Sequence, residues 1–421
     1  MNERSVLVNG ISIYSLTNPN LRSFCLSLYV RAGSIFEDLS NNGISHLFEH
    51  VVFRNIKNKY ENFYELLAMH GLCFQGSTYK KFVSFTIDGP QHEFDFAIEI
   101  LCGLFDEIKL TSHDFNNEKG RIKAEIREKD RRSSLDFYFD SIVWKNSEVE
   151  KIVLGYCKTI DRVSVKKINE FRQKVLSAGN CFVYATGNIS DENLDALNKK
   201  ISELDISQSN PGFTNTVTVN NEFFHREKKI WIKNNYWHYI QIGFDVDCSK
   251  YPGGVYDLLY ALLFNGDKAL VYNYLSEDNP IIYSYDSTFE QYDNVGNINF
   301  SFEVDRNKIE DVFKTVVELL NAAKDGRFNF EANLNYEMFN WELDLDNPDN
   351  LNWNMAYYNH ILKTQPIDYS DEFYGRFRVT KEQIIDAAKY IFRRCNMTVA
   401  VKGDRKKINA EAIEKILELL D

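Results

Sequence analysis

The chain contains two copies of one pattern of residues. The stretch GISHLFEHVVFRN, which begins at Gly43, aligns with GVYDLLYALLFNG, which begins at Gly254, at an offset of 211 (254 − 43). A second pair, VSVKKINEFRQKVLSAGNCFVYATGN from Val163 and VTKEQIIDAAKYIFRRCNMTVAVKGD from Val379, has an offset of 216 (379 − 163). Any two helix-then-strand segments resemble each other, but two matches in one order and at nearly one offset indicate an internal duplication. The sequence therefore predicts two domains of the same fold.

The duplication divides the chain near its middle. A chain of 421 residues is also too long for a single ordinary core. The polar stretch DISQSNPGFTNT has the Pro, Gly, Asn and Ser content of a linker. We therefore expect a first domain at 1–205, a linker at 206–216 and a second, degenerate copy of the domain at 217–421.

Local patterns within the first half alternate between strand and helix. Two β-rich runs flank Asn9-Gly10, a dipeptide typical of hairpin turns, and FCLSLYVRAG and CFQGSTYKKFVSFTIDG contain further strands. Helical spacing of apolar residues marks GISHLFEHVVF, NKYENFYELLAMHG and HEFDFAIEILCGLFDEI, and a fourth helix follows with Ser112 or Asp114 as its N-cap. The predicted fold class is α+β, with two duplicated domains that each have an antiparallel-rich sheet and helices on one face.

Composition excludes several classes of protein. A net charge of −12 argues against nucleic acid as a partner and is compatible with cationic peptides. No apolar run reaches the roughly 18 to 20 residues that span a bilayer, and MNERSVLVNG resembles neither a secretion signal nor a transit peptide. The seven cysteines form no CxxC pair, which favours reduced thiols over a disulfide framework or a zinc ribbon. We expect a cytoplasmic protein, of bacterial origin.

One polar triplet differs between the two copies. His46, Glu49 and His50 lie in an apolar helical stretch of the first copy, and the second copy has Asp257 and Ala261 at the positions of the two histidines. The fold therefore does not require the histidines for packing. One alternative is a pair of histidines that are simply packed or hydrogen-bonded within a helix.

The spacing of the triplet suits a metal. Residues four apart lie on one face of a helix, so His46 and His50 can direct two imidazoles at one ion, as in zinc sites. Glu49 borders the same face and could accept a proton from a water molecule. A catalytic zinc takes three protein ligands and keeps one open position, so a third ligand is required.

The best source of a third ligand is NNEKGRIKAEIREK. Glu118 and Glu125 are seven residues apart and share one face of the predicted helix. The alternative is a solvated helix with Glu–Lys pairs, which we prefer for Glu128 and Lys129. Spacing alone does not decide the roles of Glu118 and Glu125.

At this point the sequence resembles a known family. The H-x-x-E-H motif, the glutamate pair and the two α+β halves are similar to the inverzincin zinc peptidases of the pitrilysin family, in the branch of mitochondrial processing peptidase and small bacterial relatives. The resemblance covers nearly the whole chain. In that family a glutamate about 75 residues after the second histidine completes the metal site, and 125 − 50 = 75. It implies one Zn²⁺ held by His46, His50 and Glu125, with Glu49 as general base and Glu118 steadying a ligand histidine.

The family also has a substrate-binding edge strand after the zinc helix, typically with Asn-Ala and a Thr. This chain has Gln75, Gly76, Ser77 and Thr78 at the corresponding positions. An edge strand has free backbone N–H and C=O groups, so an extended peptide can be added as a further strand. The alternative is an ordinary strand with a bulge at the glycine.

The second half departs from the family. Self-sufficient members have a stretch like R-E-K-R-G-L-A-Y, whose Arg and Tyr reach the substrate. The corresponding stretch here is SEDNPIIY, in which Tyr283 matches the Tyr but Ser276 replaces the Arg and is followed by Glu277 and Asp278. Loss of a donor directed at an oxyanion typically costs a few kcal/mol of transition-state stabilisation.

The missing arginine has to be supplied from elsewhere. The simplest replacement is a homologous, zinc-less partner subunit that supplies Arg and Tyr, as in two-subunit members, so that the duplicated domains form a clam-shell with the partner chain. Arg306 or Arg376 of this chain is the other source. We expect a zinc-dependent endopeptidase subunit that cleaves extended or unfolded peptides, a leader or precursor peptide being one option. The alternatives are a non-catalytic structural or peptide-binding subunit and a self-sufficient homodimeric peptidase.

Overall fold

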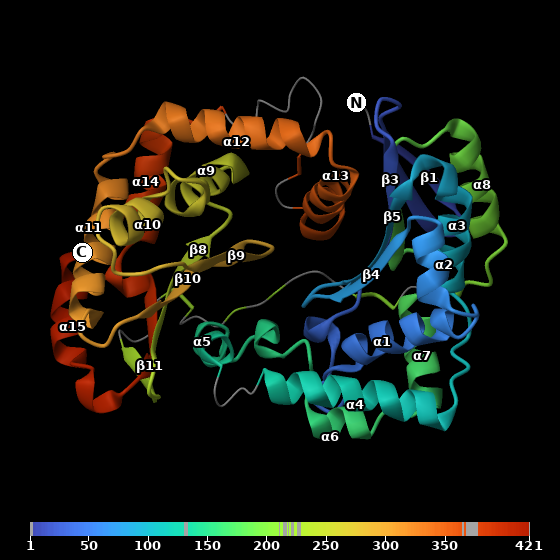
Figure 1. Ribbon diagram of the computed structural model, residues 1–421, viewed down its shortest axis with the longest axis horizontal. Coiled ribbons are helices and arrows are strands. Elements are labelled where there is room, and N and C mark those ends of the chain that lie inside the picture. The colour runs from blue at the N-terminus through green and yellow to red at the C-terminus, as the bar shows by residue number, and fades with distance from the viewer. Residues whose placement is uncertain are drawn as a thin grey trace. The chain divides into compact units, whose positions relative to one another are not determined.

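The computed structural model divides into two compact units. It describes residues 3–129, 134–209, 211–213, 217, 219, 223–224, 229–363, 366–367 and 378–420. The first unit comprises Met1–Asp130, Glu148–Asn215 and Glu342–Ser370, and the second comprises Arg131–Ser147, Thr216–Trp341 and Asp371–Asp421. Each unit has one β-sheet with helices packed on it (Figure 1).

The first sheet has the strand order β1-β2-β6-β3-β5-β4. Its strands are β1 (Arg4–Val8), β2 (Ile11–Thr17), β3 (Ser23–Val30), β4 (Cys73–Thr78), β5 (Val83–Pro90) and β6 (Cys181–Gly187). The predicted hairpin is confirmed, because β1 and β2 pair antiparallel about Asn9 and Gly10, whose φ angles are 51° and 78°. Only β2 and β6 run parallel among the paired strands of this sheet. β4 is an edge strand that pairs with β5 alone among the described strands.

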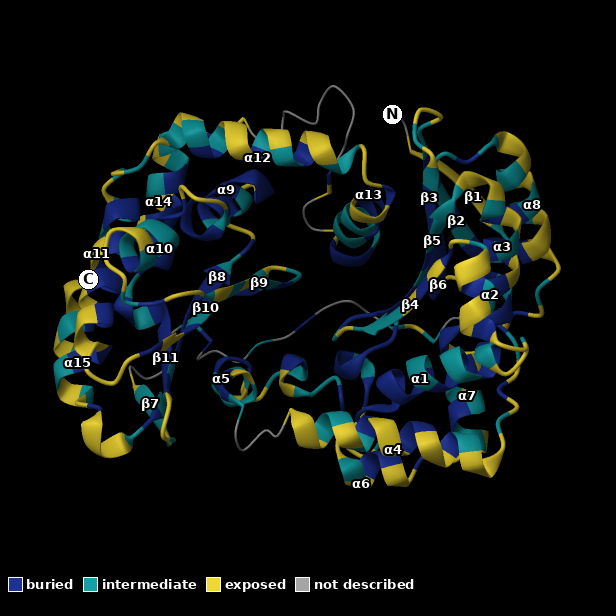
Figure 2. Ribbon diagram, in the orientation of Figure 1, coloured by how far each residue is buried: buried dark blue, intermediate teal, exposed yellow. Residues whose placement is uncertain are grey.

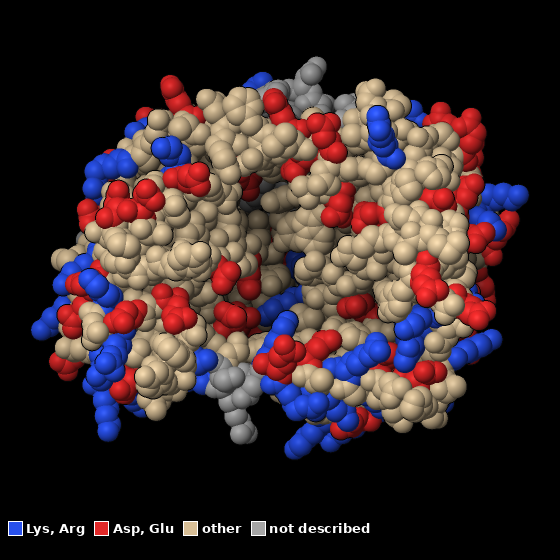
Figure 3. Space-filling model, viewed as in Figure 1, with Lys and Arg blue, Asp and Glu red and all other residues tan. Residues whose placement is uncertain are grey.

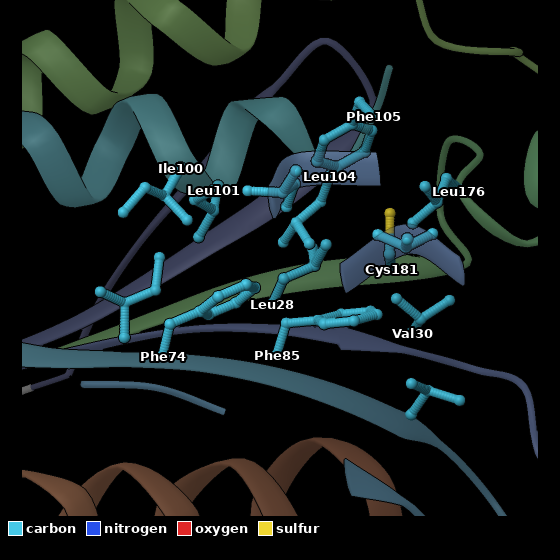
Figure 4. Close-up of a cluster of buried hydrophobic side chains, with 14 of the residues drawn as sticks. Leu28, Val30, Phe74, Phe85, Ile100, Leu101, Leu104, Phe105, Leu176 and Cys181 are labelled. Atoms are coloured by element: carbon cyan, nitrogen blue, oxygen red, sulfur yellow. The ribbon is translucent and has the colours of Figure 1, made fainter. Parts of the chain in front are cut away.

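Helices cover one face of this sheet. They are α1 (Ile44–Lys57), α2 (Phe63–Met69), α3 (Phe94–Gly103), α4 (Ser112–Glu128), α6 (Cys157–Asp161), α7 (Val165–Val175) and α8 (Asp191–Ser202). Apolar side chains of α3 and of the sheet meet in the core, where Ile100 and Leu101 point toward Phe74 and Phe85 (Figure 4). α1 is mostly buried, whereas α4 has an exposed outer face (Figure 2).

The N-cap of α4 differs from the predicted one. Thr111 has extended backbone angles, and its side chain accepts the N–H of Asp114 at 3.1 Å. Ser112 is already helical, so the predictions of Ser112 or Asp114 as the cap were wrong. The capping residue is the last non-helical one whose hydroxyl can reach the third N–H of the helix.

The second sheet repeats the order of the first. Its strands, in the order β7-β11-β8-β10-β9, are β7 (Ile230–Asn234), β8 (His238–Asp247), β9 (Asp286–Tyr292), β10 (Val295–Val304) and β11 (Met397–Gly403). The helices of this unit include α9 (Gly253–Phe264), α10 (Leu270–Tyr272), α11 (Ile309–Lys324), α14 (Lys381–Ile391) and α15 (Ala410–Leu417). Most of α12 (Phe330–Asp344) also belongs to this unit, and its last three residues belong to the first unit. The order matches β2-β6-β3-β5-β4, and β7 and β11 are parallel, as β2 and β6 are. The predicted duplication of an α+β fold is therefore confirmed.

The duplication extends to single hydrogen bonds. Asn180 and Asn396 correspond at the offset of 216. The amide of Asn180 donates to the carbonyl of Val175 at 2.8 Å, and the amide of Asn396 donates to the carbonyl of Ile391 at 3.3 Å. Each asparagine thus donates to the carbonyl of the last residue of a helix, which would otherwise have no partner within the helix. This role accounts for the asparagine in both copies.

Each half of the chain contributes one helix to the other unit. Residues 131–147 carry α5 (Leu135–Val143) and belong to the second unit, whereas residues 342–370 carry α13 (Pro348–Met355) and belong to the first. The two exchanged segments correspond at the repeat offset, since 342 − 131 = 211. The contiguous domains expected from the sequence differ from the compact units at these segments, because each helix packs on a sheet that is distant in sequence.

α13 packs on the face of the first sheet opposite α3, against β3 and β6 (Figure 1). Asn352, which is 1% exposed, donates its amide to the carbonyls of Cys25 at 3.3 Å and Tyr184 at 2.9 Å. Its carbonyl oxygen accepts the hydroxyl of Tyr29 at 2.8 Å. Because every polar group of this buried amide has a partner, the position of α13 on the sheet is strongly specified.

The composition predicted free cysteines and no membrane-spanning segment. All seven cysteines are free, as expected. Among the helices that the structure describes, none is both long and apolar enough to cross a bilayer.

Candidate functional site

The start of α1 is fixed by a buried carboxylate. Glu37 is 4% exposed, and its two oxygens accept the backbone N–H groups of Gly43 at 2.7 Å and Ser45 at 2.8 Å. Gly43 has a φ of 95°, and a Cβ there would lie 2.7 Å from the Cα of Gly155, so a side chain does not fit. Burial raises the pKa of Glu37, opposed by its hydrogen bonds to the helix N-terminus. No sequence signal marked Glu37 as the residue that sets this helix.

α1 and α4 bring the three predicted metal ligands together. The Nε2 atoms of His46 and His50 each lie 3.6 Å from an oxygen of Glu125. One ligand atom from each residue falls within 4.8 Å of the others. Zinc binds imidazole nitrogen and carboxylate oxygen at about 2.0 to 2.2 Å. A single ion could therefore contact all three atoms, and the donor set fits zinc.

The protonation of the histidines is set by their surroundings. Burial, followed by the charge of His50, lowers the pKa of His46 to about 3, so His46 is neutral, the form that binds metal. Burial also lowers the pKa of His50, but the carboxylates of Glu118, Glu49 and Glu125 outweigh it and the pKa is raised. The carboxylates around His50 thus favour a positive charge at this position, which a cation would supply.

Glu118 lies behind the ligands. An oxygen of Glu118 lies 3.6 Å from Nδ1 of His50, the nitrogen that faces away from Glu125. Glu118 is 2% exposed, and its charge is balanced by Arg54 at 3.1 Å and Arg121 at 3.4 Å. The two glutamates that spacing could not distinguish thus have different positions, Glu125 at the Nε2 atoms and Glu118 at Nδ1. Arg54 was not among the predicted site residues, although it lies four residues after His50 on the same helix face.

The side chain of Glu49 extends from α1 to the edge strand β4. The hydroxyl of Thr78 donates to Oε2 of Glu49 at 2.7 Å. Burial raises the pKa of Glu49, and the bond from Thr78 and the charge of His50 oppose that rise. A partly buried carboxylate with a raised pKa beside a metal site can act as a general base near neutral pH.

The close approach of β4 depends on Gly76. A Cβ at position 76 would lie 2.9 Å from Oε1 and 3.0 Å from Cγ of Glu49. The alternative of a bulge at Gly76 is wrong, because the register runs without interruption from Cys73 opposite Asp88 to Thr78 opposite Val83. The glycine therefore makes room for the carboxylate.

The remaining predicted residues lie in the second unit. Tyr283 is 97% exposed and lines a pocket of about 660 Å³ that Arg306 also lines. Ser276 and Glu277 lie in a short π-helical turn, Asn273–Glu277. Arg376, the other arginine that we considered, lies outside the described residues. Tyr283 and Arg306 thus share one pocket, whereas the metal-ligand candidates belong to the first unit.

Two family models match the chain in succession. The model described as insulinase, peptidase family M16, matches residues 13–155, and the model described as the inactive domain of that family matches residues 162–332. The first match includes His46, Glu49, His50 and Glu125.

Curated relatives include zinc proteases. The chain is 21% identical over 332 residues to an uncharacterized zinc protease of Bacillus subtilis, a match that covers 77% of this chain and 79% of the relative. It is 24% identical over 194 residues to the beta subunit of the mitochondrial-processing peptidase of Saccharomyces cerevisiae, covering 45% of this chain and 42% of that subunit. The match thus spans less than half of the yeast subunit.

Solved structures share the fold. A protease from Helicobacter pylori superposes with a TM-score of 0.83 at 19% identity, covering 96% of this chain and 99% of that one. The peptidase M16 inactive domain from Pseudomonas fluorescens superposes with a TM-score of 0.80 at 14% identity, covering 96% and 98%. The family matches, the zinc-protease relatives and the fold agree with the resemblance seen in the sequence: the chain belongs to peptidase family M16, the insulinase-like peptidases.

Proposed function

We propose that the chain is the zinc-bearing subunit of an endopeptidase that cleaves extended or unfolded peptides. The observation that carries the proposal is the convergence of His46, His50 and Glu125, with ligand atoms within 4.8 Å of one another, next to Glu49 and an edge strand. A non-catalytic subunit would not need this complete set of groups.

Each group has a role in hydrolysis. A bound zinc would supply Lewis-acid chemistry, polarising a peptide carbonyl and acidifying water. Glu49 accepts the proton of the attacking water and then delivers it to the leaving amine. Thr78 holds the Glu49 carboxylate by one oxygen, which leaves the other free for that proton. The free edge of β4 binds the substrate backbone, so that the peptide lies extended beside Glu49.

A second chain is part of the proposal. Ser276 stands where self-sufficient members have Arg, and Glu277 and Asp278 follow it. The beta subunit of the yeast mitochondrial-processing peptidase, a relative of the chain, is by its name one part of an assembly. A homologous zinc-less partner would supply Arg and Tyr to the substrate. A homodimer that uses Arg306 is the alternative, favoured by the pocket that Arg306 shares with Tyr283.

The free thiols support a reducing compartment such as the cytoplasm, although one structural relative is the first half of a periplasmic protease of Escherichia coli. A leader or precursor peptide remains one option for the substrate.

The proposal is tested with Glu49→Gln, assayed with the partner present. This change removes the base but keeps the three ligands, so peptide hydrolysis should fall by at least about 10²-fold while zinc remains bound. Glu128→Gln, an exposed change on α4, is the control and should hydrolyse peptide at the wild-type rate. Undiminished hydrolysis by Glu49→Gln would refute the assignment of the base.

A further inference from the structure

A second polar cavity lies on the other face of the first sheet. It has a volume of about 420 Å³ and is bounded by side chains of β4 and β5 on one side and of α13 and the last residue of α12 on the other. Its strand side includes Gln75, Ser77 and Ser84, and its helix side includes Asp349 and Trp353. α13 is held on the sheet by buried hydrogen bonds, so the wall of the cavity is fixed.

Strand β4 connects this cavity with the candidate metal site. Gly76 and Thr78 contact Glu49 on the α1 face, whereas Gln75 and Ser77, which alternate with them, line the cavity. Alternate residues of a strand point to opposite faces of its sheet. A peptide added to the free edge of β4 would therefore direct every second side chain toward the face that holds the cavity.

The cavity is acidic. Asp344 and Asp349 line it, and among its described lining residues none is Lys or Arg. The carboxylate of Asp344 accepts the amides of Asn350 and Asn354, both at 2.9 Å, so it is held in place. Burial raises the pKa of Asp344, against the effect of these two bonds. Asp88 lies close by, and burial followed by the charge of Asp349 raises its pKa to about 6. Burial is the main cause of both shifts, and the charge of Asp349 adds to the shift of Asp88.

Its other walls suit the stem of a long cationic side chain. The rings of Tyr79 and Trp353 lie with their centroids 5.1 Å apart and both line the cavity. Aromatic faces bind both aliphatic stems and the guanidinium or ammonium group. Ser84 is 5% exposed, and its hydroxyl makes no hydrogen bond within the described part of the chain, so it can accept from a ligand.

We propose that this cavity, bounded by Asp344, Asp349, Tyr79 and Trp353, binds the Arg or Lys side chain of a peptide added to β4. The inference rests on the proposed function and specifies its substrate class, namely peptides that carry a basic residue at a position facing away from Glu49. Carboxylates with two aromatic neighbours distinguish such a side chain from neutral ones of equal size, because only a cation pairs with the negative charges of Asp344 and Asp349.

A binding experiment tests this without catalysis. A labelled ten-residue peptide of Ala and Ser carries one Arg at successive positions, and its affinity for the zinc-loaded Glu49→Gln chain is measured by fluorescence anisotropy. The matched peptide carries citrulline, which is neutral and has nearly the same shape. At one register we expect Arg to bind at least about tenfold more tightly than citrulline, a ratio in the range for a partly buried charge pair.

Variants assign that preference to the cavity. Asp344→Asn with Asp349→Asn should abolish the Arg preference, and Asp349→Asn alone, which leaves the Asp344 bonds intact, should reduce it. Asp346→Asn removes an exposed carboxylate of the same segment that does not line the cavity, and should keep the preference. Equal binding of Arg and citrulline peptides at every register, a preference that survives in the double variant, or no peptide binding at all would overturn the proposal.

Hydrolysis separates the two proposals. If the wild-type chain, assayed with its partner, cleaves Arg and citrulline peptides equally, the cavity is not the specificity site and the peptidase assignment stands. If the Arg peptide binds selectively but is not cleaved, the cavity proposal stands and the peptidase assignment fails.

Discussion

At the scale of single residues, the site depends on how Glu49 is held. Thr78 donates to one of its oxygens, and this bond opposes the rise in pKa that burial causes. Glu118 is not one of the three metal-ligand candidates; it lies beside Nδ1 of His50. Arg54 in turn pairs with Glu118. Partners of this kind orient metal ligands and set their basicity.

Thr78→Val tests the contact to Glu49. Loss of the donated hydrogen bond removes a stabilisation of the carboxylate, so the pKa of Glu49 should rise further. A general base works only when deprotonated, and activity is lost as the pH falls through its pKa. The acidic limb of the pH–kcat profile should therefore move to higher pH with unchanged zinc content. Thr315→Val, which removes a hydroxyl bond to a helix carbonyl in the second unit, should leave the profile unchanged. An unshifted acidic limb in Thr78→Val would show that Glu49 does not titrate in it.

At the scale of elements, β4 and α1 approach each other because position 76 has no side chain. Gly76→Ala places a Cβ 2.9 Å from Oε1 of Glu49. Displacement of a catalytic group by about 1 Å can cost about 10²-fold in rate, so we expect kcat/KM to fall by about that factor. The stability of the fold, measured by urea unfolding, should change little because the added methyl group meets the side chain of Glu49 rather than backbone.

The matched control for this change is Gly120→Ala on α4. A Cβ at that position meets no atom within 4 Å. Alanine favours a helix over glycine by up to about 1 kcal/mol, so this variant should be slightly more stable and equally active. Wild-type kcat/KM in Gly76→Ala would mean that β4 does not constrain Glu49.

The sequence predicted these elements unevenly. The helix with His46 and His50, the Asn9-Gly10 hairpin and the repeat follow from local spacing and composition, and the structure has all three. The exchange of α5 and α13 could not be predicted, because neither helix carries a local mark of which sheet it packs on. The Glu37 carboxylate bonds to the N–H groups of Gly43 and Ser45 across a loop that has no periodic pattern. The acidic cavity is lined by residues far apart in the chain, such as Ser77 and Asp349, which periodicity does not bring together.

At the scale of the whole molecule, the two copies have diverged in chemistry while keeping one fold. The first has the metal-ligand candidates, and the second has Ala261 and Asp257 in place of the histidines and Ser276 in place of the family's Arg. The net charge is −12, but the visible face has no single acidic patch. Lys and Arg gather over α4 and at the lower left of the view, and Asp and Glu are scattered over the whole face (Figure 3).

The missing arginine predicts dependence on a partner. The isolated chain should hydrolyse peptides poorly, and a homologous chain that lacks H-x-x-E-H but has the Arg-Tyr stretch should restore activity, saturating at one partner per chain. Replacement of the partner's arginine should lower the rate by about 10²- to 10³-fold, as for other oxyanion donors. Turnover of about 1 s⁻¹ or more by the isolated chain would contradict this, and Arg306→Ala would then be the next variant to assay.

The most direct test of the account is the zinc content of the purified chain, measured by mass spectrometry of the metal together with the protein concentration. We predict about one zinc per chain in the wild type and in Glu49→Gln, and none in His46→Ala or Glu125→Gln, because only the last two lose a ligand. A wild-type chain that binds no zinc, or a His46→Ala chain that keeps it, would contradict the assignment of the metal site.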